Sequence, residues 1–184
     1  MSRTFEVDHN RLFDNLENVL KKDLTSTALE ANGGRSVLFV YPPNEDEEYI
    51  AEGKRRLNGE DYKFIDIREV FTKYVEEIGQ ANFEEILSNF GKEVYRSENG
   101  ASGTFFEFLM NVIVEAENED KSPVLVHTGA FYDMGISNIH IMEDTRVMIA
   151  KHQLVVFYPA TVEGETIKFL GKVPASRYRC IVIK

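Results

Sequence analysis

The sequence predicts an α/β fold with three layers, in which helices cover both faces of a mostly parallel sheet. Short apolar segments alternate along the chain with longer segments of helical periodicity. The segment 37–41 is apolar throughout, as strands are when both of their faces are buried, and the strand expected over 124–128 begins with three apolar residues. The chain has 184 residues, contains no evident linker or repeat, and is therefore expected to form a single domain over 1–184.

The first half of the chain shows clear helical and strand patterns. Apolar spacing predicts a helix over 9–22, with Asp8 as its N-cap. The polar segment 23–35 is expected to be a turn region leading into the strand 37–41, which Pro42-Pro43 should end because proline has no N–H for the ladder. The other elements expected here are a helix over 45–57, a strand over 62–66, a helix capped by Asp66 and ended by Gly79, and a helix capped by Asn82.

The second half continues the alternation. Thr104 is expected to cap a largely buried helix over 105–116, because apolar residues occupy much of its circumference. The elements expected after it are a strand over 124–128, a weaker helix over 141–149, a strand over 153–158 ended by Pro159, and two short strands over 166–170 and 178–183. The last two strands are compatible with antiparallel pairing.

Composition and charge narrow the classes of function. Hydrophobic residues make up 43% of the chain, which is enough to build a core and excludes a disordered protein. The formal net charge is −10, so the chain as a whole repels phosphate backbones and no direct binding to nucleic acid is expected. Two basic clusters, 54–56 and Arg177 with Arg179, are interpreted as solvated surface.

The sequence favours a cytoplasmic location. Cys180 is the single cysteine and lies in an apolar segment, which is typical of a buried thiol in a reducing compartment. The first residues lack an apolar stretch of signal-peptide length, and no segment approaches the roughly 18 apolar residues of a membrane span. We therefore expect no membrane association.

The loop after the first strand argues against a nucleotide cofactor. Ligands of open α/β sheets bind beyond the carboxyl ends of the strands. A phosphate site there needs glycines and a lysine or a helix N-terminus, but this loop has Pro42-Pro43 and four acidic residues, 45–48. The acidic residues are suited either to a favourable helix start or to coordination of Mg²⁺ or Ca²⁺. We favour the helix start and expect neither a metal nor a cofactor.

One candidate catalytic group follows the third strand. His127 is suited to act as a general base if Asp133 or Asp66 orients it, because both carboxylates are expected near the same edge of the sheet. The alternative is a histidine that packs or caps a backbone group, which we favour since no nucleophile motif accompanies it. The other histidines, His9, His140 and His152, lack metal-ligand spacing.

Aromatic residues gather where the strands are expected to end. Tyr41 precedes Pro42, Tyr132 follows Thr128-Gly129, and Tyr158 precedes Pro159. Tyrosine provides a large contact area at low entropic cost, so an exposed cluster of this kind is typical of a protein-binding surface. The alternative is that each ring simply covers the end of the sheet with its hydroxyl in water.

Several of these segments resemble the BrxB family of the BREX bacteriophage-exclusion systems, and the order of elements matches over nearly the whole chain. The segments that carry the resemblance are 38–43, 124–132 with Thr128-Gly129 and Tyr132, 155–159 with Gly164, and 169–171 with a final strand containing Tyr178. The chain departs from the family after Tyr132, where it has Asp133 to His140 in place of a proline and an arginine-histidine stretch.

The resemblance implies a P-loop NTPase-like domain that lacks the phosphate loop. It also implies a non-catalytic accessory protein that binds a PglZ-like protein of the alkaline-phosphatase superfamily and other BREX components. Under this interpretation the binding residues are Tyr41, Pro42, Thr128, Gly129, Tyr132, Tyr158 and Pro159. The alternative function is a small hydrolase or nucleotide-processing enzyme that uses His127 with Asp133 or Asp66.

Overall fold

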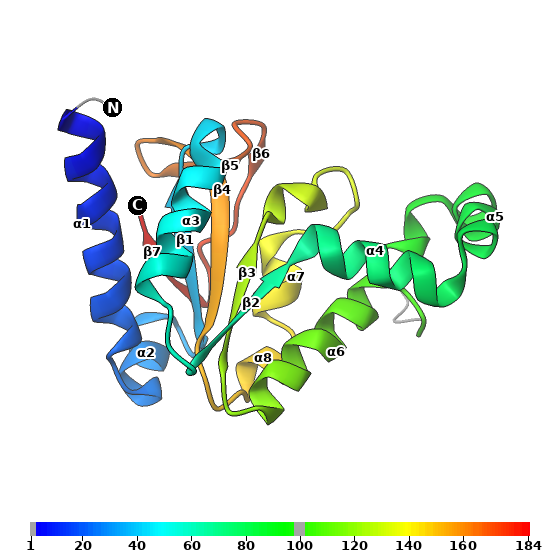
Figure 1. The fold of residues 1–184 in the computed structure, drawn as a ribbon, viewed down its shortest axis with the longest axis horizontal. Helices are drawn as coiled ribbons and strands as arrows, with labels where there is room; N and C mark the ends of the chain where they lie inside the picture. The colour runs from blue at the N-terminus through cyan, green and yellow to red at the C-terminus, as the bar shows by residue number, and fades with distance from the viewer. Residues whose placement is uncertain (1–2, 98–101) are drawn as a thin grey trace.

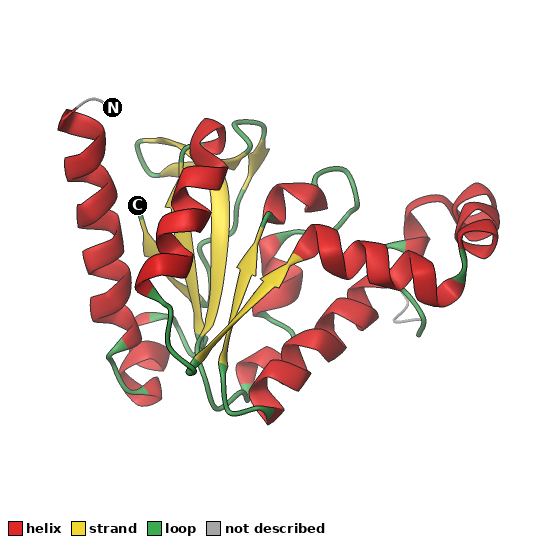
Figure 2. Cartoon of the chain, viewed as in Figure 1, coloured by secondary structure: helices red, strands yellow, loops and turns green. Residues whose placement is uncertain are grey.

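A mostly parallel sheet forms the middle layer of the molecule, and helices cover both of its faces (Figures 1 and 2). The computed structural model describes residues 3–97 and 102–184. The strands are β1 (Ser36–Tyr41), β2 (Tyr62–Asp66), β3 (Ser122–Val126), β4 (Leu154–Glu163), β5 (Thr166–Phe169), β6 (Val173–Pro174) and β7 (Cys180–Ile183). The three-layer α/β fold expected from the sequence is confirmed.

The helices are joined to the strands by short connections. The α-helices are α1 (Arg3–Leu20), α2 (Leu24–Glu30), α3 (Asp46–Arg56), α4 (Ile67–Ile78), α5 (Gln80–Phe90), α6 (Phe105–Asn118), α7 (Asn138–Met142) and α8 (Thr145–Met148). Three short 3-10 helices are η1 (Pro43–Glu45), η2 (Gly91–Val94) and η3 (Thr128–Phe131).

The central strands lie in the order β2-β3-β4-β1-β7, and all four neighbouring pairs are parallel. The final strand, β7, pairs in parallel with β1, so the antiparallel alternative is wrong for this strand. Antiparallel pairing is confirmed for β5, which pairs with the end of β4 on one side and with β6 on the other. The β5–β6 hairpin therefore rises from the carboxyl end of the sheet.

Side chains of β1 alternate between two cores because both faces of this strand are buried. Phe39 packs with residues of α1 and α3 on one face, whereas Leu38 packs with residues of α4, α6 and α7 on the other. Helix α1 contributes Phe13, which is fully buried, and its ring centroid lies 4.9 Å from that of Phe39. The continuous apolar pattern of β1 is thus explained by burial between two helical layers.

Helices α4, α5 and the start of α6 extend away from the sheet as an arm (Figure 1). The Asp66 side chain accepts a hydrogen bond from the Arg68 N–H at the start of α4, and Gly79 ends that helix, both as expected. Helix α5 begins at Gln80, so Asn82 is not its N-cap; its amide donates instead to the Ile78 carbonyl.

Three further boundaries differ from the sequence prediction. Helix α1 begins at Arg3 and places Asp8 within its second turn, so Asp8 is not the N-cap. The segment 23–35 contains α2, whose N-cap Asp23 accepts a hydrogen bond from the Ser26 N–H. The single helix expected over 141–149 is divided into α7 and α8, because Asp144 accepts from the Arg146 N–H and starts a new helix.

Pro159 does not end β4. It is the last residue of β4 that pairs with β1, and pairing with β5 begins at Ala160. A proline is tolerated at this position because it lies between the two ladders, so its missing N–H removes no hydrogen bond from the middle of either one. Within the described residues, none of the helices is both long enough and apolar enough to cross a bilayer.

Candidate functional site

The carboxyl ends of β1, β2 and β3 bring three side chains together. Asp66 ends β2 and is paired in register with Val126, the last residue of β3. His127 follows directly, so the histidine and the carboxylate become neighbours at the same edge of the sheet. Glu47 reaches this edge from the first turn of α3. Helix α3 packs on one face of the sheet and α4 on the other, which makes this edge the place where α/β sheets bind ligands.

His127 lies between the two carboxylates. Its Nδ1 is 2.9 Å from Oδ2 of Asp66, although the angles are not those of a hydrogen bond. Its Nε2 is hydrogen-bonded to Oε1 of Glu47 at 3.3 Å. The exposed fraction of the side chain is 6% for His127 and 74% for Glu47. The imidazole is therefore enclosed by the protein on the Asp66 side and covered on the other side by the largely exposed side chain of Glu47.

Asp66 is held as a carboxylate by its neighbours. Burial favours the neutral acid, but hydrogen bonds from the side chain and the backbone N–H of Arg68, together with the charge of His127, outweigh it, so the pKa of Asp66 is lowered. Nη2 of Arg68 lies 3.0 Å from Oδ2 of Asp66, and Nη1 lies 3.6 Å from Oε1 of Glu47. These four residues, Glu47, Asp66, Arg68 and His127, are called the His127 cluster below.

The backbone of His127 is strained. Its φ of 55° lies in the left-handed region, which disfavours residues with a side chain by about 1–2 kcal/mol. The left-handed turn ends β3 two residues earlier than expected and starts η3 at Thr128. Such a conformation persists when surrounding contacts enforce it, and it is frequent at functional sites.

The His127 cluster has a base but no evident nucleophile. The neighbouring hydroxyl of Thr128 is buried and donates a 2.6 Å hydrogen bond to the Phe157 carbonyl, so it is directed into the fold. The Asp133 carboxylate is also directed away, since it pairs with Lys92 at 2.5 Å. Of the two acids expected beside His127, the structure thus brings in Asp66 and not Asp133. What remains is a His–Asp pair able to move a proton or to hold a polar ligand.

No part of the described chain groups three or more His, Cys, Asp or Glu side chains in a way that could hold a metal ion. The acidic residues 45–48 form η1 and the first turn of α3. Their position is favourable for the helix dipole. The alternative of a metal site in this loop gains no support from the geometry.

The expected exposed patch of Tyr41, Tyr132 and Tyr158 does not form. The exposed fraction is 1% for Tyr41 and 4% for Tyr158, against 42% for Tyr132. The Tyr41 ring stacks on Tyr49 of α3 at 4.8 Å between centroids, because α3 folds back over the end of β1. Pro42, next to it, is the N-cap of η1. Tyr41 and Tyr158 belong to opposite cores and cannot share one surface.

The remaining predicted binding residues meet where η3 packs on β4. Thr128 is tied to the Phe157 carbonyl, and a Cβ at Gly129 would lie 3.8 Å from Pro159. Tyr158 stacks on Phe169 of β5 at 4.7 Å between ring centroids. These contacts fix η3 against the β4–β5 pair, so Thr128, Gly129 and Pro159 act as packing residues. A pocket lies beside them and is lined by other residues of the same elements, among them Phe131, Tyr158 and Phe169.

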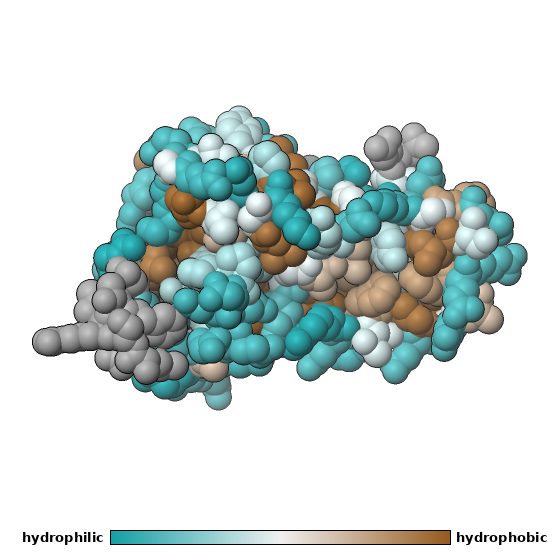
Figure 3. All heavy atoms as spheres, turned by 90° about the horizontal axis from the view of Figure 1, so that it is seen from above, coloured by the Kyte–Doolittle hydropathy of each residue, from teal (hydrophilic) through white to brown (hydrophobic). Residues whose placement is uncertain are grey.

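This pocket, called the η3 pocket below, has a volume of about 340 Å³. Its lining is mainly apolar and comes from η3, α7, β4, β5 and β6; it includes Phe131, Tyr132, Ile136, Ile141, Tyr158 and Phe169. Figure 3 looks onto the molecule from above the view of Figure 1 and shows apolar atoms at the surface between polar ones.

Comparison with family models, with curated proteins and with solved structures finds no match for this chain. The site therefore rests on its own geometry. Sequence reasoning missed two of its parts, Glu47 beside His127 and Phe169 beneath Tyr158. Glu47 could have been found because it lies in the first turn of the helix after a central strand, at the edge where His127 was expected. Phe169 had no comparable signal, since its position depends on β5 pairing with β4.

Proposed function

We propose that this chain is a non-catalytic accessory protein of a BREX-type antiviral defence complex, which acts in the cytoplasm and binds a PglZ-like partner. Support comes first from the residues that resemble the BrxB family along nearly the whole chain. We also propose that the chain is a P-loop NTPase-like domain that lacks the phosphate loop. In agreement with this, the loop after β1 forms a 3-10 helix with Pro43 and Glu45 in place of glycines.

The observation that carries the proposal is an exposed surface at the β5–β6 hairpin, made of Tyr132, Lys172 and Val173. Tyr132 and Val173 are exposed by 42% and 45%, and both line the η3 pocket. Nζ of Lys172 lies 4.7 Å from the centroid of the Tyr132 ring, which joins the hairpin to η3. An exposed tyrosine beside apolar and cationic groups is the composition of a protein interface.

Co-purification of the tagged chain with the PglZ-like protein from the same host tests this proposal. We expect a stable complex with the wild type and at least tenfold weaker binding for Tyr132→Ala, because aromatic anchors contribute about 2 kcal/mol or more. Leu29→Ala is the matched control, since Leu29 is 79% exposed on α2. Equal loss in both variants, or full binding by a folded Tyr132→Ala protein, would contradict this surface.

The alternative is a small hydrolase or nucleotide-processing enzyme, and one observation favours it. The 2.9 Å distance between His127 Nδ1 and Asp66 Oδ2 places an acid beside a potential general base, and a small rotation of either side chain would align them for a hydrogen bond. Glu47 is largely exposed and able to leave Nε2 open to a substrate or a water. In this alternative His127 takes the proton, Asp66 orients the ring, and water is the nucleophile.

A screen with phosphate, acyl and nucleotide substrates tests the alternative. The variant His127→Asn is suited to this purpose because asparagine tolerates the left-handed conformation. Activity that this variant loses by about a hundredfold or more would establish the enzyme. Absence of activity in the wild type, or activity retained by a folded His127→Asn protein, would remove His127 as a base.

A further inference from the structure

The η3 pocket is lined by a tyrosine whose hydroxyl the described protein does not use. Tyr158 is 4% exposed and lines the pocket, yet within residues 3–97 and 102–184 its hydroxyl has no hydrogen-bond partner. Two other buried tyrosines differ in this respect. The Tyr41 hydroxyl donates to Asp46, and the Tyr74 hydroxyl donates to the Gly103 carbonyl. Because Tyr158 lines the pocket and its hydroxyl is not engaged elsewhere, this donor is available to a molecule in the pocket.

The walls of the pocket suit a flat apolar group. Tyr158 and Phe169 are stacked with an angle of 24° between their rings, and Ile136 and Ile141 add aliphatic surface. A volume of about 340 Å³ falls within the range of small-molecule sites, roughly 300–1,000 Å³. An aromatic ring fits both the size of this space and its composition.

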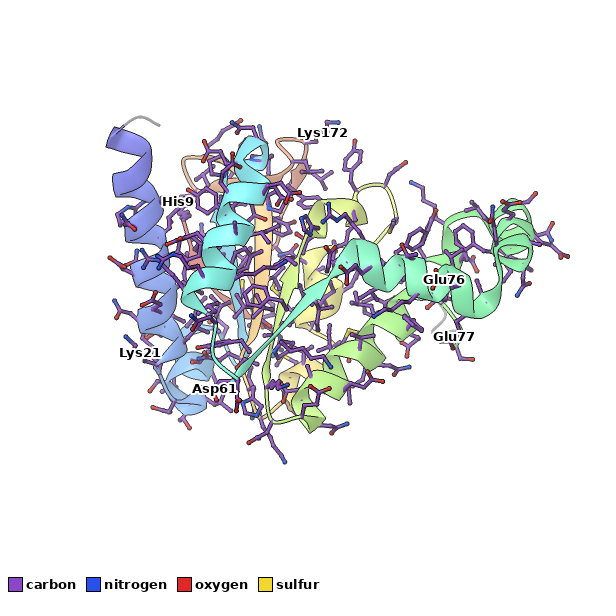
Figure 4. The ribbon with its side chains drawn as sticks, in the orientation of Figure 1. His9, Lys21, Asp61, Glu76, Glu77 and Lys172 are labelled. Atoms are coloured by element: carbon purple, nitrogen blue, oxygen red, sulfur yellow. The ribbon has the colours of Figure 1, made fainter. Side chains whose placement is uncertain are left out.

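A cation borders the pocket of this acidic protein: Lys172 lies next to the lining residues Tyr132 and Val173, on the side called the mouth below. Lys172 lies over the Tyr132 ring at the top of the molecule (Figure 4). No described carboxylate lies within ion-pair distance of its ammonium group, whereas the other lysine at the mouth, Lys92, is paired with Asp133. Burial also raises the pKa of Tyr158, so its hydroxyl stays protonated and acts as a donor at neutral pH. A donor inside and a cation at the mouth both favour an anionic oxygen.

We propose that the η3 pocket binds a small aromatic carboxylate. The ring lies against Tyr158 and Phe169, one carboxylate oxygen accepts a hydrogen bond from the Tyr158 hydroxyl, and Lys172 supplies the opposite charge at the mouth. The site adds to the proposed partner binding and does not depend on it. Because Tyr132 belongs both to the pocket and to the partner surface, an occupied pocket would change that surface.

Titration of the isolated protein with phenylacetate, followed by amide NMR shifts, tests the proposal. We expect saturable shifts confined to η3, β4, β5 and β6 at concentrations up to about 10 mM, with a Kd near 1 mM. Phenylacetamide has the same ring without the charge and should bind several-fold more weakly. Absence of saturable shifts in these segments would overturn the proposal.

Three variants locate the binding. Tyr158→Phe removes only the hydroxyl and should weaken phenylacetate binding about fivefold or more, as expected for one hydrogen bond to a charged group. Lys172→Gln should weaken the binding of phenylacetate and leave the binding of phenylacetamide unchanged. Tyr41→Phe removes a buried hydroxyl outside the pocket and should have no effect. Unchanged binding by a folded Tyr158→Phe protein, or a loss in Tyr41→Phe equal to that in Tyr158→Phe, would also overturn the site.

Co-purification with the PglZ-like protein separates this site from the proposed function. Tyr158→Phe should retain the partner because its hydroxyl is buried, whereas Tyr132→Ala should lose it. A chain that binds phenylacetate and no partner would support the pocket alone, and a chain that binds the partner without phenylacetate would support the interface alone.

Discussion

The hydroxyl of Tyr41 donates a 2.5 Å hydrogen bond to Oδ1 of Asp46, which joins the last residue of β1 to the first residue of α3. Burial raises the pKa of Tyr41, and the bond to Asp46 raises it further, so the phenol stays protonated. The ring stacks on Tyr49, one turn further along the same helix. Tyr41 therefore positions α3, and with it Glu47 of the His127 cluster.

Truncation of Tyr41 should separate the effect of its hydroxyl from that of its ring. Tyr41→Phe should lower the free energy of unfolding by about 1–2 kcal/mol, because it removes one hydrogen bond to a charged group. Tyr41→Ala should lower it by about 3–5 kcal/mol, because it leaves a cavity against Tyr49. Urea unfolding measures both values. Near-equal losses in the two variants would show that the ring contributes little.

Thr128 should behave as a structural residue. Its buried hydroxyl donates to the Phe157 carbonyl at 2.6 Å, so Thr128→Val leaves that acceptor without its partner. We expect a loss of about 1–3 kcal/mol in the free energy of unfolding. The exposed Thr161 is the control, and Thr161→Val should change stability little. A stable Thr128→Val protein that fails to bind its partner would instead assign Thr128 to the interface.

Gly34 is required by the close approach of two strands. A Cβ at this position would lie 1.9 Å from the carbonyl oxygen of Arg179, just before β7. Because β7 is paired with β1, the backbone cannot move away without breaking the sheet. Gly34→Ala should lower the unfolding free energy by about 3 kcal/mol or more. Gly59→Ala, at an exposed position with ordinary contact distances, should be close to wild type in the same urea series.

Arg56 should stabilise the packing of α1 on α3. Its guanidinium group donates to Asn10, Asp14 and Glu17 of α1 and to Glu52 of its own helix, and the side chain is only 13% exposed. Arg56→Ala should lower the unfolding free energy by about 2 kcal/mol. Limited proteolysis should then cut α1 more rapidly.

Arg55 is the matched control for Arg56. It also pairs with Glu52, but its side chain is 68% exposed and makes no contact with α1 among the described hydrogen bonds and ion pairs. Arg55→Ala should therefore lower the unfolding midpoint less than Arg56→Ala does, and it should leave the rate of proteolysis of α1 near that of the wild type. Similar changes in both arginine variants would contradict a specific role for Arg56.

The titration of Glu52 should account for part of the loss of stability at acid pH. Hydrogen bonds from Arg55 and then Arg56 lower the pKa of Glu52 from its ordinary value of 4.5 to about 2. Since the folded state holds this carboxylate more strongly, its contribution is complete above the unfolded pKa and is lost as pH falls from about 4.5 to 2. Glu52→Gln should therefore reduce stability at pH 6 and have a much smaller effect at pH 2.5. Urea midpoints at the two pH values measure the difference.

The sequence predicted most elements of the fold because their signals are local. Strand β1 is apolar on both faces, and α4 has both an N-cap at Asp66 and a terminating Gly79. Helix α2 was missed because it has seven residues and buries only Thr27, so it shows no apolar periodicity. The extension of β4 beyond Pro159 was missed because it depends on pairing with β5, which local patterns do not reveal.

The same distinction applies to the candidate site. The proximity of His127 and Asp66 followed from two neighbouring strands, and the structure confirms it at 2.9 Å. The exposure of the tyrosines could not be predicted from the order of the strands. Tyr41 is covered because α3 turns back over β1, and Tyr158 is covered because β5 places Phe169 on it. Both coverings are tertiary contacts between segments whose individual patterns do not specify the packing.

The parallel pairing of β1 with β7 has a consequence for synthesis on the ribosome. Ser36 is paired with Cys180, so one edge of β1 stays open until nearly all of the residues described here have been translated. At about 5–20 residues per second, this interval is on the order of ten seconds. During that time a nascent chain exposes an apolar strand edge, which is a target for chaperones or for mispairing. We therefore expect the native sheet to close only after release of β7 from the exit tunnel.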